Sequence, residues 1–171
     1  MRAMMFWRNL EQIGLTAIDL RNMAFSLVKF SCCLHVTATY LVDPSVCRGP
    51  SMIPTIGPMT SFLLTERISP RFGKVERGDL VIVQSPENPR KFSCKRLLGL
   101  EGDSVTFLVD PKNSDKCETV VVPKGHVWVQ GDNIYNSRDS RQLGPVPYGL
   151  LQAKVFWRLW PPGGFGPLGK I

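Results

Sequence analysis

The sequence is short of the residues that build metal centres and disulfide frameworks. Its 171 residues include five cysteines and two histidines, with no Cys-x-x-C pair and no Cys/His spacing typical of a zinc site. The number of cysteines is odd, and Cys32 and Cys33 are adjacent in an apolar stretch, which argues against a disulfide scaffold. We therefore expect no metal and no cofactor, and interpret the cysteines as small, semi-buried side chains.

The sequence also lacks a concentrated basic region. The net charge is +7, but there is no run of five or more basic residues, and few aromatic residues alternate with them. This pattern disfavours nucleic acid as a partner, whereas a basic surface beside an anionic membrane fits the charge. The length allows one domain with a hydrophobic core and an appendage.

A long apolar run free of charge is missing as well. Residues 23–42, MAFSLVKFSCCLHVTATYLV, have about the length that spans a bilayer, but Lys29 and His35 interrupt them. Lys29 is near the start of the stretch, so its amine can reach the N-terminal membrane face. Three arginines flank that face: Arg2, Arg8 and Arg21. By the positive-inside rule, they hold the N-terminus on the side of synthesis or import.

We predict one marginal membrane anchor within residues 1–42. It is not a cleaved secretory signal, because no small-x-small site follows it. The alternative is an amphipathic helix packed on a soluble domain through a stripe of Met23, Leu27, Phe30 and Leu34.

From residue 48 onward the pattern changes to short segments rich in valine and aromatic residues, typical of strands. They lie at 79–84, 104–109, 118–123, 126–130 and 154–160. Gly-Asp pairs at 78–79, 102–103 and 131–132 indicate turns between strands. The fold class is therefore mainly β, an antiparallel domain over 43–162 with one N-terminal helix. We expect the Gly/Pro-rich tail, 163–171, to be a flexible loop or frayed end.

One turn holds a serine in a fixed backbone. In "CRGPSMIPT" (47–55), Gly49 and Pro50 precede Ser51 and Pro54 follows it, so that the hydroxyl is held out of the turn. Taken alone, this is an ordinary exposed turn. A serine hydroxyl becomes a good nucleophile only when a base takes its proton.

Two kinds of base are available. A histidine triad would need His35, in the apolar segment, or His126, a strand residue near a turn. The other candidate is Lys95 in "FSCKRLLGLEGD" (92–103), on a short and mostly apolar strand. Burial there would lower the pKa of the lysine, because burial disfavours its charged form.

Alternation along this strand separates its side chains. Ser93, Lys95 and Leu97 share one face, while Cys94 and Arg96 share the other. Lys95 can therefore point into an apolar interior while Arg96 reaches a carboxylate on the opposite side.

The most polar segment is "GDNIYNSRDSRQLGPVP" (131–147). Beside the serine turn and a semi-buried lysine, it can form the floor of an active site. We expect Ser137 to orient the lysine amine, and Asp132, Asp139 and Arg141 to lock the loop by ion pairs.

"GPSMIPT", "CKRLLGLEGD" and "GDNIYNSRDSRQLGPVPYGL" resemble, in order and spacing, the three sequence boxes of type I signal peptidases. Ser51 and Lys95 are 44 residues apart, and Lys95 and Gly131 are 36 apart. The resemblance covers nearly all of 41–162. "GHVWVQGDN", "SRDSR" and "GPVPYGL" are similar to the mitochondrial inner membrane branch in a plant-like form.

The resemblance implies a role for each matched residue. Ser51 matches the nucleophile and Lys95 the general base of a Ser/Lys dyad. The supporting positions are Ser137, which orients the lysine, the bracing residues Asp132, Asp139 and Arg141, and Met52 after the nucleophile. Gly49 stands where some bacterial relatives have an oxyanion-hole serine. Because Pro50 has no N–H, the Ser51 amide is the remaining donor.

The resemblance also implies a fold, a place and partners. We expect a signal-peptidase-like β domain, anchored in the mitochondrial inner membrane and facing the intermembrane space, that cleaves sorting peptides from precursors. A related peptidase subunit is an expected partner. One alternative stays open, a non-catalytic subunit that keeps the fold. Two related classes fit less well. A self-cleaving repressor would need an N-terminal DNA-binding domain, and the endoplasmic-reticulum enzyme resembles a Ser/His arrangement.

Overall fold

The computed structural model describes residues 2–111 and 116–168. The chain divides into two units, Met1–Thr39 and Tyr40–Ile171. Part of the predicted tail, residues 169–171, and the side chains of Arg2 and Arg8 lie outside what the structure describes.

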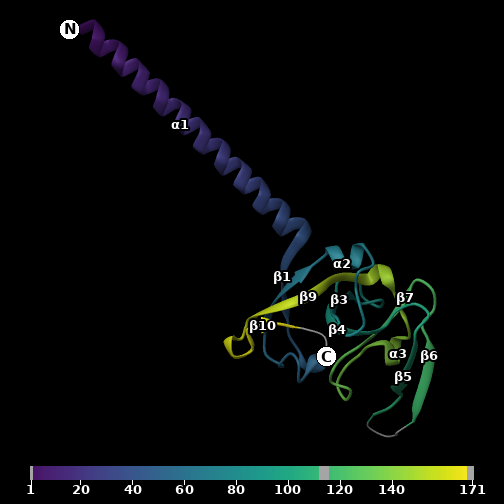
Figure 1. Ribbon diagram of the computed structural model, residues 1–171. Helices are drawn as coiled ribbons and strands as arrows, with labels where there is room; N and C mark the ends of the chain where they lie inside the picture. Colours follow the sequence, from purple (N-terminus) through teal and green to yellow (C-terminus); the bar gives the residue numbers. More distant parts are fainter. Residues whose placement is uncertain (1, 112–115, 169–171) are drawn as a thin grey trace. The chain divides into compact units, whose positions relative to one another are not determined.

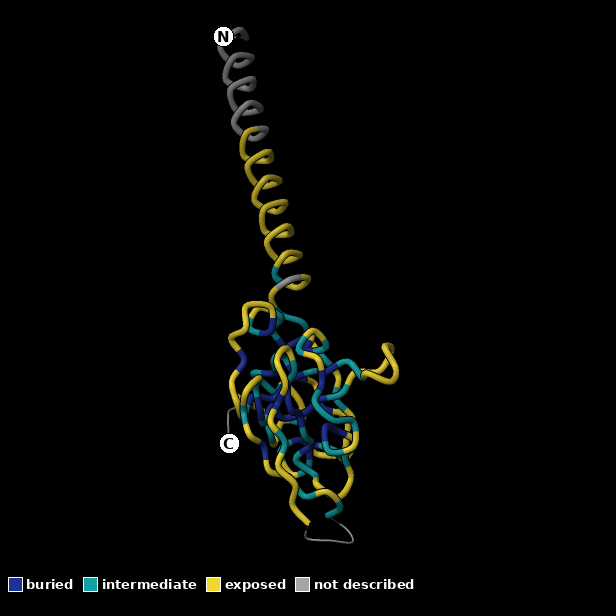
Figure 2. Tube along the Cα trace, turned by 90° about the vertical axis from the view of Figure 1, so that its right-hand side faces the viewer, coloured by how far each residue is buried: buried dark blue, intermediate teal, exposed yellow. Residues whose placement is uncertain are grey.

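The first unit is one long helix, α1 (Arg2–Val36), which passes into a π-helical turn, η1 (Thr37–Leu41). The helix thus starts well before the predicted stretch, and residue 42 belongs to a strand. Its described side chains are exposed on all sides (Figure 2), with large apolar ones among them: Ile18, Leu20, Met23, Phe25, Leu27, Val28, Phe30, Leu34 and Val36. Among the described residues, no helix combines the length and the hydropathy needed to cross a bilayer.

The second unit is built on an antiparallel sheet in the order β1-β2-β9-β3-β4-β7-β8, with β10 added beside β9 (Figure 1). Its strands are β1 (Val42–Cys47), β2 (Ser61–Glu66), β3 (Leu80–Gln84), β4 (Phe92–Gly99), β7 (His126–Gln130), β8 (Val146–Pro147), β9 (Leu151–Trp160) and β10 (Gly166–Pro167). Every pairing among them is antiparallel. The predicted fold class is confirmed.

Short helical turns join these strands. They are η2 (Pro50–Met52), α2 (Ile68–Arg71), α3 (Ser140–Leu143), η3 (Tyr148–Leu150) and η4 (Pro162–Gly164).

A separate hairpin, β5 (Ser104–Leu108) with β6 (Cys117–Val121), covers one end of the sheet. Val105, Val122 and Trp128 of β7 form one buried apolar cluster, and the rings of Phe107 and Trp128 have centroids 4.7 Å apart. This small cluster fixes the hairpin to the main sheet through apolar contact.

Two strands did not follow the valine-rich pattern. β1 carries Pro44, which lacks the N–H of a ladder donor and is tolerated because β1 lies at the edge of the sheet. β2 follows an exposed segment at 57–60, so Pro58 precedes the ladder and removes no hydrogen bond from it.

The Gly/Pro-rich tail is more regular than predicted. Gly166 and Pro167 pair with Trp157 and Arg158 of β9, and the Arg158 guanidinium donates to the carbonyl of Gly164. Composition does not reveal this pairing, because it depends on the neighbouring strand.

Two apolar clusters flank strand β4, one on each face. One contains Leu97 together with Val81, Val83, Val127, Val129 and Val146, and the other contains Cys94 with Met52, Ile56, Leu63, Leu80 and Val155. A fully buried aliphatic side chain contributes about 1.5–3 kcal/mol, so both faces of β4 are firmly held. The expected alternation is confirmed, and it places Lys95 and Arg96 on opposite faces.

Candidate active site

The serine turn has a backbone that its sequence dictates. Gly49 has φ 127° and ψ 167°, a conformation that disfavours any side chain, and Pro50 starts η2, which is one turn of 3-10 helix. Met52 is 1% exposed and packs in the cluster with Cys94, while Ser51 is half-buried at the surface of a groove. The buried methionine thus anchors the turn and leaves the serine accessible.

Lys95 is buried in the middle of β4, with 4% of its surface exposed. Its Nζ donates a hydrogen bond of 2.8 Å to Ser137 Oγ. Burial lowers the pKa of the Lys95 amine below its ordinary value, an effect that the carboxylate of Asp139 opposes and the guanidinium of Arg141 reinforces. Burial therefore makes the Lys95 amine easier to deprotonate than the amine of a free lysine.

Ser137 also interacts with a buried carboxylate, since its hydroxyl helps to lower the pKa of Asp139. The Ser137 oxygen accepts the hydrogen bond from Lys95. A neutral Lys95 amine held in this way keeps its one lone pair for another proton.

Asp139 fixes the loop that carries Ser137. Its Oδ2 accepts from the amide of Gly131 at 2.8 Å, and its carboxylate receives two side-chain hydrogen bonds from Arg141, at 2.9 and 2.8 Å. Asp139 also caps helix α3 in a capping box with Gln142. Burial alone would raise the pKa of Asp139, but the hydrogen bonds from Arg141, Gly131 and Ser137 hold it below its ordinary value.

Arg96, the neighbour of Lys95, forms the second polar network. Its Nε and one terminal nitrogen donate to both oxygens of Asp132 at 2.7 Å, and the other terminal nitrogen donates to the carbonyl of Gly78 at 2.8 Å. Thr55 Oγ1 donates to Asp132 Oδ2 at 2.5 Å. This bidentate pair ties the end of the serine turn to β4.

The loop holds the serine turn by backbone contacts as well. The amide of Asn133 donates to the carbonyl of Ser51 at 3.0 Å, and its side-chain amide donates to the carbonyl of Pro50 at 3.0 Å. A Cβ built on Gly131 would lie 2.2 Å from Ser137 Oγ and 2.5 Å from the carbonyl oxygen of Ser51. Glycine is therefore required at 131, because Ser51 and Ser137 both touch its backbone.

The structure thus brings together the three segments that the sequence singled out. Three further residues of the site were not predicted from the sequence, although they lie inside the quoted motifs: Gly131, Asn133 and Thr55. In the described residues no hydrogen bond joins Ser51 Oγ to Lys95 Nζ. Catalytic hydrogen bonds are often long in a free enzyme and shorten when substrate binds.

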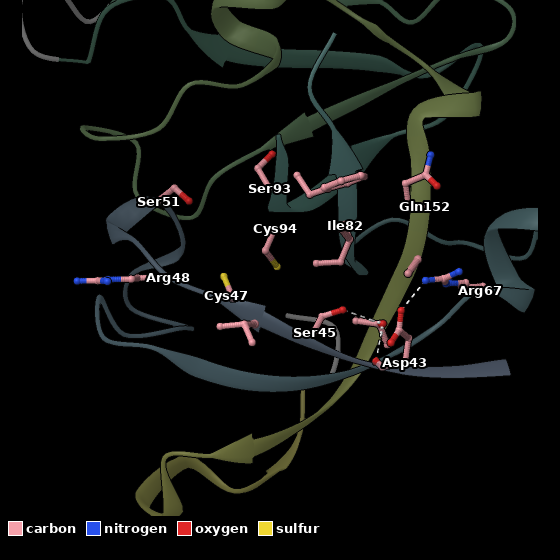
Figure 3. A pocket seen from close by; sticks show the side chains of 14 residues that line it. Asp43, Ser45, Cys47, Arg48, Ser51, Arg67, Ile82, Ser93, Cys94 and Gln152 are labelled. Atoms are coloured by element: carbon pink, nitrogen blue, oxygen red, sulfur yellow. Dashed lines mark hydrogen bonds and ion pairs between the residues drawn. The ribbon is translucent and has the colours of Figure 1, made fainter. Parts of the chain in front are cut away.

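Two cavities meet at this site. A groove of about 580 Å³ is lined by Ser51, Ser93, Ile82, Cys94 and Gln152, among others (Figure 3). A smaller cavity of about 200 Å³ has Lys95 and Asp139 in its wall. Ser93 lines both, so the groove of Ser51 and the cavity of Lys95 share one wall.

The alternative base, His126, is placed elsewhere. It begins β7, its Nδ1 lies 3.0 Å from the carbonyl of Lys124, and it lines neither cavity. Among the described residues, no group of three or more His, Cys, Asp or Glu side chains is arranged to hold a metal ion.

Comparison with known proteins gives three findings. The chain matches the family described as signal peptidase, peptidase S26, over residues 20–111 and 108–160. It is 57% identical over 143 residues to mitochondrial ATP-independent inner membrane protease subunit 1b of Arabidopsis thaliana, covering 84% of this chain and 85% of the relative. It is also 36% identical over 162 residues to mitochondrial inner membrane protease subunit 2 of Schizosaccharomyces pombe, covering 88% and 86%.

Among solved structures, a signal peptidase I from Enterococcus faecalis aligns with a TM-score of 0.41 and 26% identity, over 47% of this chain and 96% of that one. The sequence matches confirm the resemblance to signal peptidases and to the mitochondrial inner membrane branch in its plant form.

Proposed function

Since this chain belongs to the peptidase S26 family of signal peptidases, we propose that it is a serine endopeptidase in which Ser51 is the nucleophile and Lys95 the general base. The observation that carries the proposal is the buried Lys95 amine. It bonds Ser137 at 2.8 Å, beside a glycine whose backbone touches both Ser137 and Ser51.

The proposed reaction follows from the protonation state of Lys95. The neutral amine takes the proton of the Ser51 hydroxyl as its oxygen attacks the scissile carbonyl carbon. The Ser51 N–H stabilises the developing oxyanion. Lys95 then gives its proton to the leaving amine, and an acyl-enzyme remains. Water, activated by the same amine, attacks the ester and releases the second product.

The two polar networks have separate roles in this account. Ser137 and Asp139 direct the lone pair of Lys95, whereas Arg96 and Asp132 hold the turn that presents Ser51. Such positioning lowers the barrier because the reacting groups need no reorganisation before attack.

We propose an extended peptide as the substrate. The groove beside Ser51 runs along β1, whose far side pairs with β2. An extended chain can add main-chain hydrogen bonds to such an edge. The family description, signal peptidase, supports this substrate class, and we propose sorting peptides of precursor proteins as the natural substrates.

The relatives are named as mitochondrial inner membrane proteases, and we propose the same membrane here, with the catalytic unit in the intermembrane space. The exposed apolar side chains of α1 need a cover, and lipid can supply it. Since the relatives include both subunit 1 and subunit 2, we propose a related subunit as partner.

Cleavage of a precursor peptide by the full chain in detergent micelles, followed by mass spectrometry, tests the catalytic proposal. Ser51→Ala should abolish cleavage, and Ser104→Ala, an exposed serine on β5, should leave it unchanged. Cleavage by Ser51→Ala would exclude Ser51 as nucleophile. If a partner subunit is needed and Ser51→Ala still supports its activity, this chain is a non-catalytic subunit.

Alkaline carbonate extraction tests the anchor. The full chain should stay with the membrane, and a chain that starts near Asp43 should be released more easily. Complete extraction of the full chain would favour the amphipathic-helix alternative.

A further inference from the structure

The two cavities at the site lie on opposite faces of strand β4. Cys94 lines only the groove that contains Ser51, and Lys95 lines only the smaller cavity, here called the Lys95 cavity. Phe92 and Ser93 line both. Figure 3 shows the labelled side chains of Ser93 and Cys94 leaving the strand in opposite directions. The first half of β4 therefore forms the partition between the two cavities.

One edge of this half of β4 is open. Within the described residues, Phe92 to Arg96 pair with β3 on one side, whereas pairing with β7 on the other side begins only at Arg96. The amide and the carbonyl of Leu97 bond toward the β3 side. Because main-chain groups of alternate residues point to opposite sides of a strand, those of Cys94 face the open edge. An extended peptide can pair with such an edge.

A peptide paired with this edge presents its side chains to both cavities. Successive side chains of an extended chain point to opposite faces of the sheet that it joins. Alternate side chains therefore enter the Ser51 groove and the Lys95 cavity. Ser51 lines the groove and not the cavity. The residue whose carbonyl Ser51 attacks then places its side chain in the groove, and the residue before it faces the Lys95 cavity.

The inner wall of the Lys95 cavity is apolar. Val83, Val129 and Val146 line it, and all three belong to the buried cluster around Leu97. The half-buried side chain of Leu143 completes this wall. The cavity has a volume of about 200 Å³, against about 580 Å³ for the groove. The smaller volume and the apolar wall fit a single aliphatic side chain.

The charged groups around the cavity do not favour a charged guest. They are Glu87, Lys91, Lys95, Arg138 and Asp139. Glu87 forms an ion pair with Arg138, Asp139 receives two hydrogen bonds from Arg141, and Lys91 is exposed. A carboxylate that entered the cavity would lose water beside the buried Asp139, and an ammonium group would lose water beside Lys95. Burial of a charge without a matched partner is costly.

We propose that the Lys95 cavity is a specificity site that accepts an uncharged, apolar side chain from the second residue before the cut. The proposal rests on the proposed peptidase function and names a feature of its substrates. Leu143 is the specificity residue, because it lines the cavity, is half-buried and takes no part in the mechanism described above.

Cleavage of a random peptide library by the full chain in detergent micelles tests this site. Mass spectrometry of the products aligns the peptides at the cut. We expect apolar residues to be enriched and charged residues depleted at the second residue before the cut. In matched single peptides, leucine at this residue should give a kcat/KM at least about 10-fold higher than alanine. Absence of a preference there, or a preference confined to the first and third residues before the cut, would overturn the proposal.

Two variants of the cavity wall should change the preference in opposite directions. Leu143→Phe fills the cavity and should abolish the advantage of the leucine peptide, while cleavage of the alanine peptide stays near the parental rate and shows that the fold is intact. Leu143→Ala enlarges the cavity and should favour a peptide with phenylalanine at the same residue. Leu159→Phe, at an exposed position of β9 that lines neither cavity, is the control. Parental preferences in both Leu143 variants would overturn the proposal.

Peptide binding separates this proposal from the peptidase function. The full chain with Ser51→Ala is immobilised, and the peptides that it retains from the same library are sequenced. Addition of Leu143→Phe should shift the retained peptides from leucine-rich to alanine-rich sequences. A parent chain that cleaves no peptide, combined with this shift, would refute the peptidase function and leave the specificity site standing. Identical retained peptides with and without Leu143→Phe would overturn the site itself.

Discussion

Lys95 and Arg96 are consecutive basic residues on β4 with nearly equal burial, 4% and 6% exposed. Their hydrogen-bond partners, however, are of different kinds. Arg96 meets a carboxylate with a bidentate pair and also donates to the carbonyl of Gly78. Lys95 donates to one neutral hydroxyl, and the nearest carboxylate network, at Asp139, is already engaged by Arg141.

This difference explains how one strand supplies both support and chemistry. A buried cation with a matched carboxylate stays charged and fixes its surroundings. A buried amine without such a partner favours its neutral form. A strand places neighbours on opposite faces, so the two environments remain separate even though the residues are adjacent.

The largest expected effect is on catalysis at Lys95. Lys95→Met and Lys95→Arg should each lower kcat/KM by about 10⁴-fold or more, because neither side chain accepts a proton. A precursor peptide assay measures this loss. Cleavage by either variant at a near-parental rate would place the base elsewhere, with His126 as the next candidate.

Although Lys95→Met should lower kcat/KM, it should raise the stability of the protein at neutral pH. A lowered lysine pKa means that protonation opposes folding, and this penalty is fully present below the folded-state pKa. It disappears as the pH rises toward the unfolded value near 10.5. The melting temperature of Lys95→Met should therefore exceed that of the parent chain at neutral pH, and the gain should shrink as the pH rises. An equal gain at all pH values would contradict a buried, titrating amine.

The matched change on the other face, Arg96→Met, should lower the free energy of unfolding by about 3–5 kcal/mol, because it leaves the Asp132 carboxylate buried without its cation. Urea unfolding monitored by circular dichroism measures it. The double variant Arg96→Met, Asp132→Leu should recover much of the loss. If Arg96→Met is as stable as the parent, the proposed difference between the Lys95 and Arg96 faces of β4 is contradicted.

Ser137→Ala should lower kcat by about 10²-fold with the fold retained, since the amine loses the group that orients it. The pH dependence of kcat/KM should also move to lower pH, because the ammonium form loses its acceptor. Asn136→Ala, on the exposed neighbour, is the control. A lower kcat without any shift in the pH dependence of kcat/KM would indicate that Ser137 has only a structural role.

The smallest effect is expected at Thr55. Thr55→Val removes two hydrogen bonds of Thr55 Oγ1, the one donated to Asp132 and the longer one accepted from Arg96, and should cost about 1 kcal/mol of stability. Because Arg96 still holds that carboxylate, kcat should change little. Thermal unfolding measures the stability, and the peptide assay measures kcat. A loss of cleavage as large as that of Ser137→Ala would show that the Arg96–Asp132 ion pair alone does not hold the serine turn.

Much of this arrangement could be predicted from the sequence because its signals are local. Alternation along 92–99 places Lys95 and Arg96 on opposite faces, and valine-rich segments mark five strands. The edge strand β1 was not predicted, because Pro44 interrupts the pattern typical of a strand. The Asn133 contacts to the serine turn depend on two segments far apart in the sequence that pack against each other. The need for glycine at 131 has the same origin, and no spacing rule reveals it.

The most direct test of the central claim is the pH at which Lys95 loses its proton. It can be followed by NMR in the full chain with lysine labelled with ¹³C at Cε, and Lys95→Met assigns the resonance. The account predicts a midpoint below about 10.4, the value of a free lysine, and equal to the midpoint of the kcat/KM profile. A resonance that titrates at the free value, or at a pH unrelated to that profile, would contradict the assignment of Lys95 as the general base.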